Sequence, residues 1–162
     1  MIAIVVLSAI EMFVIEPYTN LNISEIAGYL IMLISMIFVF IGIKYYRDKE
    51  NNGVLTFWQG LKIGILIVLI PSVAFGLFDL LYTEVINPGW MENYYSKMVE
   101  HIQKTTAPEK LEAALKKLQA NKEMFSNPAM QFLLMALTVF IIGFIVTIIS
   151  SLALRRNKAA IA

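Results

Sequence analysis

Four long apolar stretches constrain this chain more than any other feature, at about residues 1–15, 26–43, 61–86 and 129–154. A bilayer core about 30 Å thick needs about 20 mostly apolar helical residues to cross it, and the last three stretches meet that length. The first reaches only about 22 Å at about 1.5 Å per residue, which fits a helix in locally thinned lipid or one that starts upstream. With 59% hydrophobic and 15% charged residues, the chain is predicted to be an all-α integral membrane four-helix bundle, a single membrane domain over residues 1–162.

Basic residues near the ends of these stretches predict their orientation. The loop after the second stretch and the tail after the fourth carry Lys44, Arg47, Lys49, Lys62, Arg155, Arg156 and Lys158. Cytoplasmic flanks are enriched in Lys and Arg close to the membrane. Both termini are therefore expected in the cytoplasm, with residues 16–25 and 88–128 outside. The outer segment holds six lysines, but only Lys122 lies close to a span, so they do not reverse this prediction.

Residues 88–127, inserted between the third and fourth spans, are predicted to form an extracytoplasmic helical hairpin. Apolar residues recur there at helical spacing in two sets: Met91, Tyr94, Met98 and Ile102, then Leu111, Leu115, Leu118 and Phe125. Between the sets, Thr106-Ala107-Pro108-Glu109 combines a capping-box pattern with a proline in the first turn. The apolar faces of these helices need cover from each other, from lipid or from a partner.

Short local patterns mark where the other helices begin. Asn87-Pro88 is expected to start the first hairpin helix and Asn127-Pro128 the fourth span, because Asn suits the N-cap and Pro the first helical position. Thr56-Phe57-Trp58-Gln59 has the spacing of a capping box for the third span. Asn52-Gly53 predicts a turn just before it.

Small residues follow one face of three of the spans. In lipid, helices associate where small residues let their backbones approach closely. The stripes consist of Gly28, Ser35 and Gly42 in the second span, Gly60, Gly64, Ser72 and Gly76 in the third, and Gly143, Thr147 and Ser151 in the fourth. Gly and Ser are common in membrane helices in any case, but the repeated spacing favours helix packing within a bundle. A homo-oligomer or a contact with another membrane protein is the other use of such stripes.

Asp79 lies inside the third apolar stretch. About 20 residues counted from Ile63 end near Tyr82, so Asp79 is expected about one turn inside the outer boundary. A charged group costs less there than at the bilayer centre, where an Asp costs about 3 kcal/mol. Thr83, four residues on, can donate a hydrogen bond to it.

Three other polar residues are expected at a similar height, so that Glu11, Asp79, Glu84 and Gln131 could form an outer-leaflet polar layer. One hypothesis is a cation or proton site, because carboxylates within a membrane often mark such paths. The other is that each side chain reaches headgroups or water, or joins two helices. We favour the second hypothesis, and no basic residue lies at that depth to pair with these groups.

The sequence offers no pattern for catalysis or for a cofactor. Cysteine is absent, which excludes disulfides and thiolate metal sites, and the single histidine, His101, has no second histidine to share a metal with. A formal net charge of +1 argues against nucleic acid as a partner. No phosphate-binding loop, serine elbow or HExxH motif occurs. We therefore expect a non-enzyme with no catalytic residue, no metal and no cofactor.

Three segments carry a resemblance to a known family. They are YYRDKENNGVLTFWQGLKIG at 45–64, YTEVINPGWMENY at 82–94 and SLALRR at 151–156. Together they resemble the bacterial membrane family called domain of unknown function 4199, found mostly in Bacteroidetes, over about residues 26–158. The resemblance implies a four-span protein of the bacterial inner membrane with no assigned activity. It carries over no catalytic residue.

Two functions fit these observations. The first is a non-enzymatic interaction or accessory module of the membrane, with the lipid bilayer around it and a protein partner on its hairpin. The alternative is a small transporter or channel subunit that uses the outer-leaflet carboxylates for cation or proton coupling.

Overall fold

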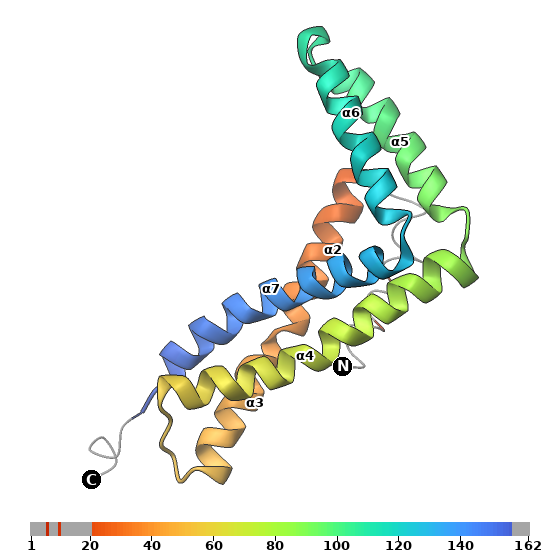
Figure 1. Cartoon of the computed structure of the whole chain (residues 1–162). Helices are drawn as coiled ribbons and strands as arrows, with labels where there is room; N and C mark the ends of the chain where they lie inside the picture. The colour runs from red at the N-terminus through yellow and green to blue at the C-terminus, as the bar shows by residue number, and fades with distance from the viewer. Residues whose placement is uncertain (1–5, 7–9, 11–20, 157–162) are drawn as a thin grey trace. The chain divides into compact units, whose positions relative to one another are not determined.

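The computed structural model describes residues 6, 10 and 21–156. This part of the chain is helical, and its only strand-like pairing is one antiparallel bridge between Leu55 and Arg156. The elements, shown in Figure 1, are α2 (Leu21–Ser35), α3 (Ile37–Tyr45), the π-helical turn η3 (Tyr46–Glu50), α4 (Phe57–Leu81), the π-helical turn η4 (Tyr82–Ile86), α5 (Trp90–Thr105), α6 (Pro108–Phe125) and α7 (Pro128–Leu154). The first predicted span, residues 1–15, lies outside the described residues except for Val6 and Ile10, which are helical.

Within the described residues, three helical stretches are long and apolar enough to cross a membrane: Ile26–Glu50, Phe57–Ile86 and Pro128–Leu154. Most of their outward side chains are aliphatic, and Leu66 and Ile149 are 63% and 60% exposed. Such a surface suits lipid, because a helix satisfies its own backbone groups and needs no water there. The structure therefore supports the predicted all-helical membrane class.

The second stretch is longer than predicted and is interrupted. The helix begins at Leu21 and continues to Glu50, instead of spanning 26–43. It breaks at Met36, whose amide hydrogen is shared between the carbonyls of Met32 and Leu33, both at 3.1 Å. Hydrophobicity falls at Lys44, but the backbone hydrogen bonds continue for another turn and a half, so the apolar run ends before the helix does.

The described chain divides into two compact units, residues 1–75 with 136–162, and Gly76–Met135. In the first unit, α4 and α7 pack at small residues. A Cβ built on Gly60 would lie 3.2 Å from the Cα of Ser151, and one built on Gly64 would collide with Thr147. One turn further, Gly143 faces Val68. As the residue number rises on α4 it falls on α7, so the two helices run antiparallel along this seam.

The same unit brings α3 onto this pair of helices. The Gly64 position also faces the side chain of Ile43, and the Gly143 position faces the sulfur of Met36. Gly42 lies against Ile67, whereas Gly28 has open space within 4 Å among the described residues. Among the described residues, the core is thus built around the glycines of α4 and α7.

Hydroxyl side chains are buried within this unit. Thr147 and Ser151 are fully buried, Ser35 is 8% exposed, and none of the three hydroxyl oxygens has a hydrogen-bond partner within the described part of the chain. Ser72 differs, because its hydroxyl donates to the backbone carbonyl of Val68 at 2.8 Å. Small size, more than hydrogen bonding, accounts for these residues at the helix contact.

The loop before α4 has the predicted local structure. The amide of Thr56 donates to Gln59 Oε1 at 2.9 Å, and the amide of Gln59 donates to Thr56 Oγ1 at 3.3 Å, which confirms the capping box. Asn52 and Gly53 have φ angles of 51° and 76°, as the predicted turn requires. Leu55 then exchanges two backbone hydrogen bonds of 2.9 Å with Arg156, which ties this loop to the end of α7.

In the second unit, α5 and α6 lie side by side (Figure 1). Lys122 joins them through an ion pair with Glu92 at 2.8 Å, and its Nζ lies 5.9 Å from the centre of the Tyr95 ring. Tyr95 is the only residue of either helix that is buried. The other apolar side chains of the pair, including Met98 and Leu115, are half-buried or exposed.

Two predicted helix starts in this unit are wrong. Asn87 closes η4 and accepts a turn hydrogen bond from Trp90 at 2.9 Å, so α5 begins at Trp90 with Gly89 as its N-cap. Thr106 is the C-cap of α5, and the N-cap of α6 is Ala107, with no side-chain hydrogen bond. The residue before a proline avoids the helical region, so Ala107 is extended and Pro108 takes the first helical position.

Candidate functional site

The residues of interest lie where α4 ends and α7 begins, within the second unit. Asp79 and Thr83 stand four residues apart on α4 and η4, on the same helical face. Gln131 is in the first turn of α7, which Asn127 caps by accepting hydrogen bonds from the amides of Ala129 at 3.0 Å and Met130 at 3.2 Å. This confirms the predicted N-cap and fixes the turn from which Gln131 projects.

The three side chains form one hydrogen-bonded group, which we call the polar clasp (Asp79, Thr83 and Gln131). Gln131 Nε2 donates to Asp79 Oδ2 at 2.7 Å and to Thr83 Oγ1 at 2.8 Å. An amide nitrogen carries two hydrogens, so both are used. Thr83 Oγ1 in turn donates to the backbone carbonyl of Asp79 at 3.0 Å.

All three members of the polar clasp are almost completely buried. Asp79 is 3% exposed, Thr83 5% and Gln131 1%. Buried polar groups cost free energy unless they are hydrogen-bonded, and here each compensates another. Among residues 21–156 no Lys or Arg forms an ion pair with Asp79, so the amide of Gln131 is its side-chain partner.

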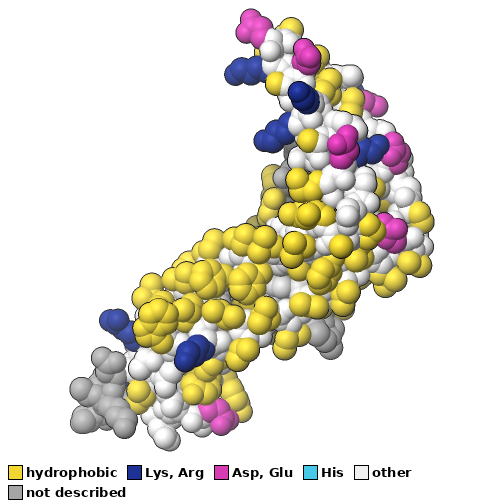
Figure 2. Space-filling model, in the orientation of Figure 1, with side chains coloured by type: hydrophobic (Ala, Val, Ile, Leu, Met, Phe, Trp, Pro, Cys, Tyr) yellow, Lys and Arg dark blue, Asp and Glu magenta, His cyan; other side chains and the backbone are white. Residues whose placement is uncertain are grey.

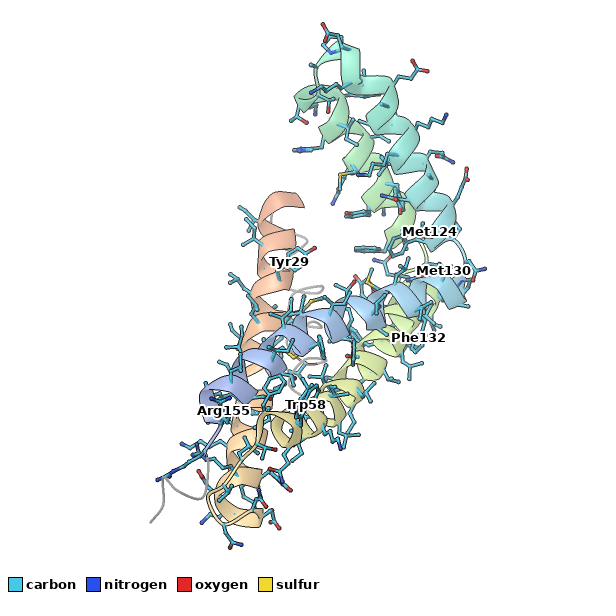
Figure 3. All side chains as sticks on the ribbon, turned by 60° about the vertical axis from the view of Figure 1, so that its left-hand side comes forward. Tyr29, Trp58, Met124, Met130, Phe132 and Arg155 are labelled. Atoms are coloured by element: carbon cyan, nitrogen blue, oxygen red, sulfur yellow. The ribbon has the colours of Figure 1, made fainter. Side chains whose placement is uncertain are left out.

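A close backbone approach lets Gln131 reach Asp79. Gly76 lies one turn before Asp79 on α4, and a Cβ built there would lie 3.0 Å from the carbonyl oxygen of Phe132 and 2.8 Å from its ring. Figure 3 labels Phe132 and Met130, the neighbours of Gln131 in the first turns of α7. Gly76 therefore keeps α4 and α7 near enough for the side-chain bond between them.

A series of aromatic residues begins at Phe78, beside Asp79, and continues along the chain into α5. The rings of Phe78 and Tyr82 are 6.5 Å apart, those of Tyr82 and Trp90 6.3 Å apart, and Trp90 stacks on Tyr94 at 5.2 Å. Tyr82 is 3% exposed. Tyrosine and tryptophan favour the boundary between lipid and water, so this series is expected to mark that boundary.

The structure brings together only part of the predicted polar layer. Asp79 and Gln131 are hydrogen-bonded to each other, whereas the Glu84 side chain is exposed. Glu11 lies outside the described residues. Thr83 belongs to the group although the predicted layer leaves it out, and its hydroxyl donates to the Asp79 backbone and not to the carboxylate as predicted. Its position four residues after Asp79 is the signal that identifies it.

The arrangement suits joining two helices better than holding an ion. Hard cations take six or more oxygen ligands, and the polar clasp offers one carboxylate, with its Oδ2 already bound to Gln131. In the described ranges, no group of three or more His, Cys, Asp or Glu side chains is placed to hold a metal. Asp79 thus takes part in a side-chain hydrogen bond between α4 and α7.

Comparison with known proteins identifies the family. A family model described as "Protein of unknown function (DUF4199)" matches residues 1–156. The chain belongs to this family. The DUF4199 match begins at residue 1 and so includes the first apolar stretch, which the motif-based resemblance over 26–158 did not cover. Searches of the curated proteins and of the solved structures found no match.

Proposed function

We propose that this DUF4199 protein is a multi-pass protein of a bacterial inner membrane that acts as a non-enzymatic interaction or accessory module. In this proposal, α5 and α6 form a helical hairpin outside the membrane, and the four apolar stretches form a bundle within it. The polar clasp holds the ends of the two spans from which the hairpin extends.

The observation that carries this proposal is how the Asp79 carboxylate is buried and hydrogen-bonded. It is buried and bound to the amide of Gln131 at 2.7 Å, which is the pattern of a bond between two helices. The surface of the proposed hairpin supports the same conclusion, since α6 buries no side chain and α5 buries only Tyr95. Half-buried residues such as Met98 and Leu115 are therefore available to a protein partner.

Transport is the second candidate, because a carboxylate within a membrane span often belongs to an ion path. A flux experiment separates the two functions. The purified protein is reconstituted into liposomes, and proton, sodium and potassium fluxes are measured for the wild type and for Asp79→Asn. The accessory function predicts no flux above protein-free liposomes for either protein. A flux that is present in the wild type and lost in Asp79→Asn would support transport and contradict the proposal.

A crosslinking experiment tests the interaction directly. A photo-crosslinking residue is placed at the exposed Lys116 on α6, and a matched one at the exposed Lys62 on α4, in cells that express the full chain. The proposal predicts a discrete crosslinked product from position 116 that position 62 does not give. The mass of that product distinguishes a second copy of the chain from another membrane protein. Equal, diffuse products from both positions would contradict a partner on the hairpin.

A further inference from the structure

We infer that the end of the first unit that carries Lys44, Lys62 and Arg155 binds anionic phospholipid headgroups through these three side chains. This inference rests on the membrane crossing proposed above and adds a lipid class to it. The chemistry recognised is the net negative charge of a headgroup such as that of phosphatidylglycerol.

Each cation ends an exposed apolar stripe on its own helix. On α4, Trp58 and Lys62 share a face with Leu66 and Ile70, which are 63% and 57% exposed. On α7, the exposed residues Ile145, Ile149 and Leu152 follow at helical spacing and lead to the exposed Arg155. On α3, Ile37 and Ile41 lead to the exposed Lys44. Figure 2 shows hydrophobic side chains over the visible face of α4 and α7, with basic side chains at its end.

Two exposed aromatic residues neighbour the cations along the chain, Tyr45 next to Lys44 and Trp58 one turn before Lys62. Trp58 is 68% exposed and Tyr45 60% exposed, and Figure 3 shows Trp58 and Arg155 at the same end of the α4–α7 pair. Exposed Trp and Tyr favour the headgroup region of a bilayer. Long basic side chains lay their stems along apolar surface and place their charge in that region. The position of the cations therefore favours lipid over an acidic protein segment.

The net charge of this end also favours the binding of anionic lipid. Residues 44–62 and 154–156 hold six basic and two acidic side chains, for a net charge of +4. Arg47 is occupied, since it bonds Asp48 at 2.6 Å and the carbonyl of Leu154 at 3.4 Å. Glu50 is exposed beside it. Lys44, Lys62 and Arg155 form no ion pair within the part that the structure describes. Lys44 interacts electrostatically with Asp48, while Lys62 and Arg155 carry the exposed charge that an anionic headgroup would meet.

The chain supplies its own reporter for a test. It has two tryptophans, Trp58 and Trp90, so Trp90→Phe leaves Trp58 alone at the basic end. Trp90 stacks on Tyr94, and phenylalanine can keep that stack. The variant is reconstituted into phosphatidylcholine vesicles that contain phosphatidylcholine or phosphatidylglycerol brominated near the headgroup. Bromine quenches Trp58 fluorescence on contact, so the ratio of the two quenching curves gives the relative binding of the two lipids.

We expect phosphatidylglycerol to bind beside Trp58 at least about fivefold more tightly than phosphatidylcholine, since one cation near the headgroups contributes about that factor. The triple variant Lys44→Gln, Lys62→Gln and Arg155→Gln should bring the ratio to about one. A matched variant, Lys110→Gln, Lys116→Gln and Lys117→Gln on α6, should leave it unchanged. In the Trp90→Phe protein without further substitutions, raising the salt concentration should lower the preference for phosphatidylglycerol.

Equal quenching by the two lipids would overturn the inference and leave the cations to water or to an acidic partner. A preference that survives the triple variant would also overturn it. Quenching by neither lipid would place Trp58 outside the bilayer. That result would contradict the membrane placement under the proposed function, and it can be told apart from a loss of lipid preference.

Discussion

Gln131 Nε2 lies 2.7 Å from Asp79 Oδ2, although 52 residues separate the two along the chain. The bond joins the end of α4 to the start of α7, on either side of the segment that forms α5 and α6. If it is a structural bond, the two side chains should show coupled effects on stability and no effect on ion flux.

A double-mutant cycle with Asp79→Ala and Gln131→Ala tests this coupling. Side-chain hydrogen bonds between membrane helices average about 0.6 kcal/mol and reach about 1.7 kcal/mol. We expect a coupling free energy of about 1 to 2 kcal/mol, measured by denaturant unfolding in detergent. Additive effects of the two substitutions would show that the side chains do not stabilise each other.

Glycine substitutions test the packing of α4 on α7. Gly64→Ala places a methyl group against Thr147 and Ile43, and overpacking of a tight contact costs about 1 to 3 kcal/mol. The matched change Gly28→Ala meets no described atom within 4 Å and should be neutral or slightly stabilising, because alanine is the better helix former. Thermal unfolding of the two variants compares them directly. Equal losses of stability in the two variants would contradict a tight contact between α4 and α7 at Gly64.

Two threonines with the same sequence signal should behave differently. Thr56→Ala removes the capping interaction with Gln59 and should cost about 1 kcal/mol. Thr106→Ala removes no side-chain cap of α6 and should cost little. The free energies of unfolding of the two variants, measured under the same conditions, compare the two losses directly. A larger loss for Thr106→Ala would contradict the structure at the start of α6.

This pair also shows how far the sequence predicts the fold. The apolar stretches predict three membrane-length helices because length and composition alone decide that property. The capping box at Thr56 is predicted correctly because its two residues determine it locally. At Thr106 the same pattern fails, since Pro108 forces Ala107 into an extended conformation, with ψ 144°, and moves the helix start by one residue.

The polar clasp could be predicted only in part. Hydrophobic depth places Asp79 and Gln131 at one level of the membrane, but depth carries no information on which faces of two helices meet. The contact depends on Gly76 and Phe132, which bring the two backbones together, and on the cap at Asn127. The Asn-Pro pattern at 87–88 fails as a helix start because Asn87 still belongs to the turn that closes η4, where its amide donates to the carbonyl of Tyr82 at 2.7 Å.

Tyr95 makes the proposed hairpin sensitive to high pH. Burial, with a smaller contribution from Tyr94, raises the pKa of the Tyr95 phenol above its ordinary value of 10.0. The folded state therefore holds this proton more tightly than the unfolded state. Its contribution to stability is complete below about pH 10 and is lost as the pH rises through the folded pKa. Circular dichroism of the wild type should show a loss of stability there that Tyr95→Phe reduces, and an equal loss in both proteins would contradict this role of Tyr95.

The central claim is that α4 and α7 cross a membrane and place the hairpin on the side opposite to the loop before α4. Because the chain has no cysteine, single cysteines at Asn52 and Ser126, both exposed, report topology directly with a membrane-impermeant thiol reagent in sealed cells. The account predicts that Ser126→Cys is labelled in intact cells and that Asn52→Cys is labelled only after the membrane is opened. Labelling of both positions in intact cells would contradict it.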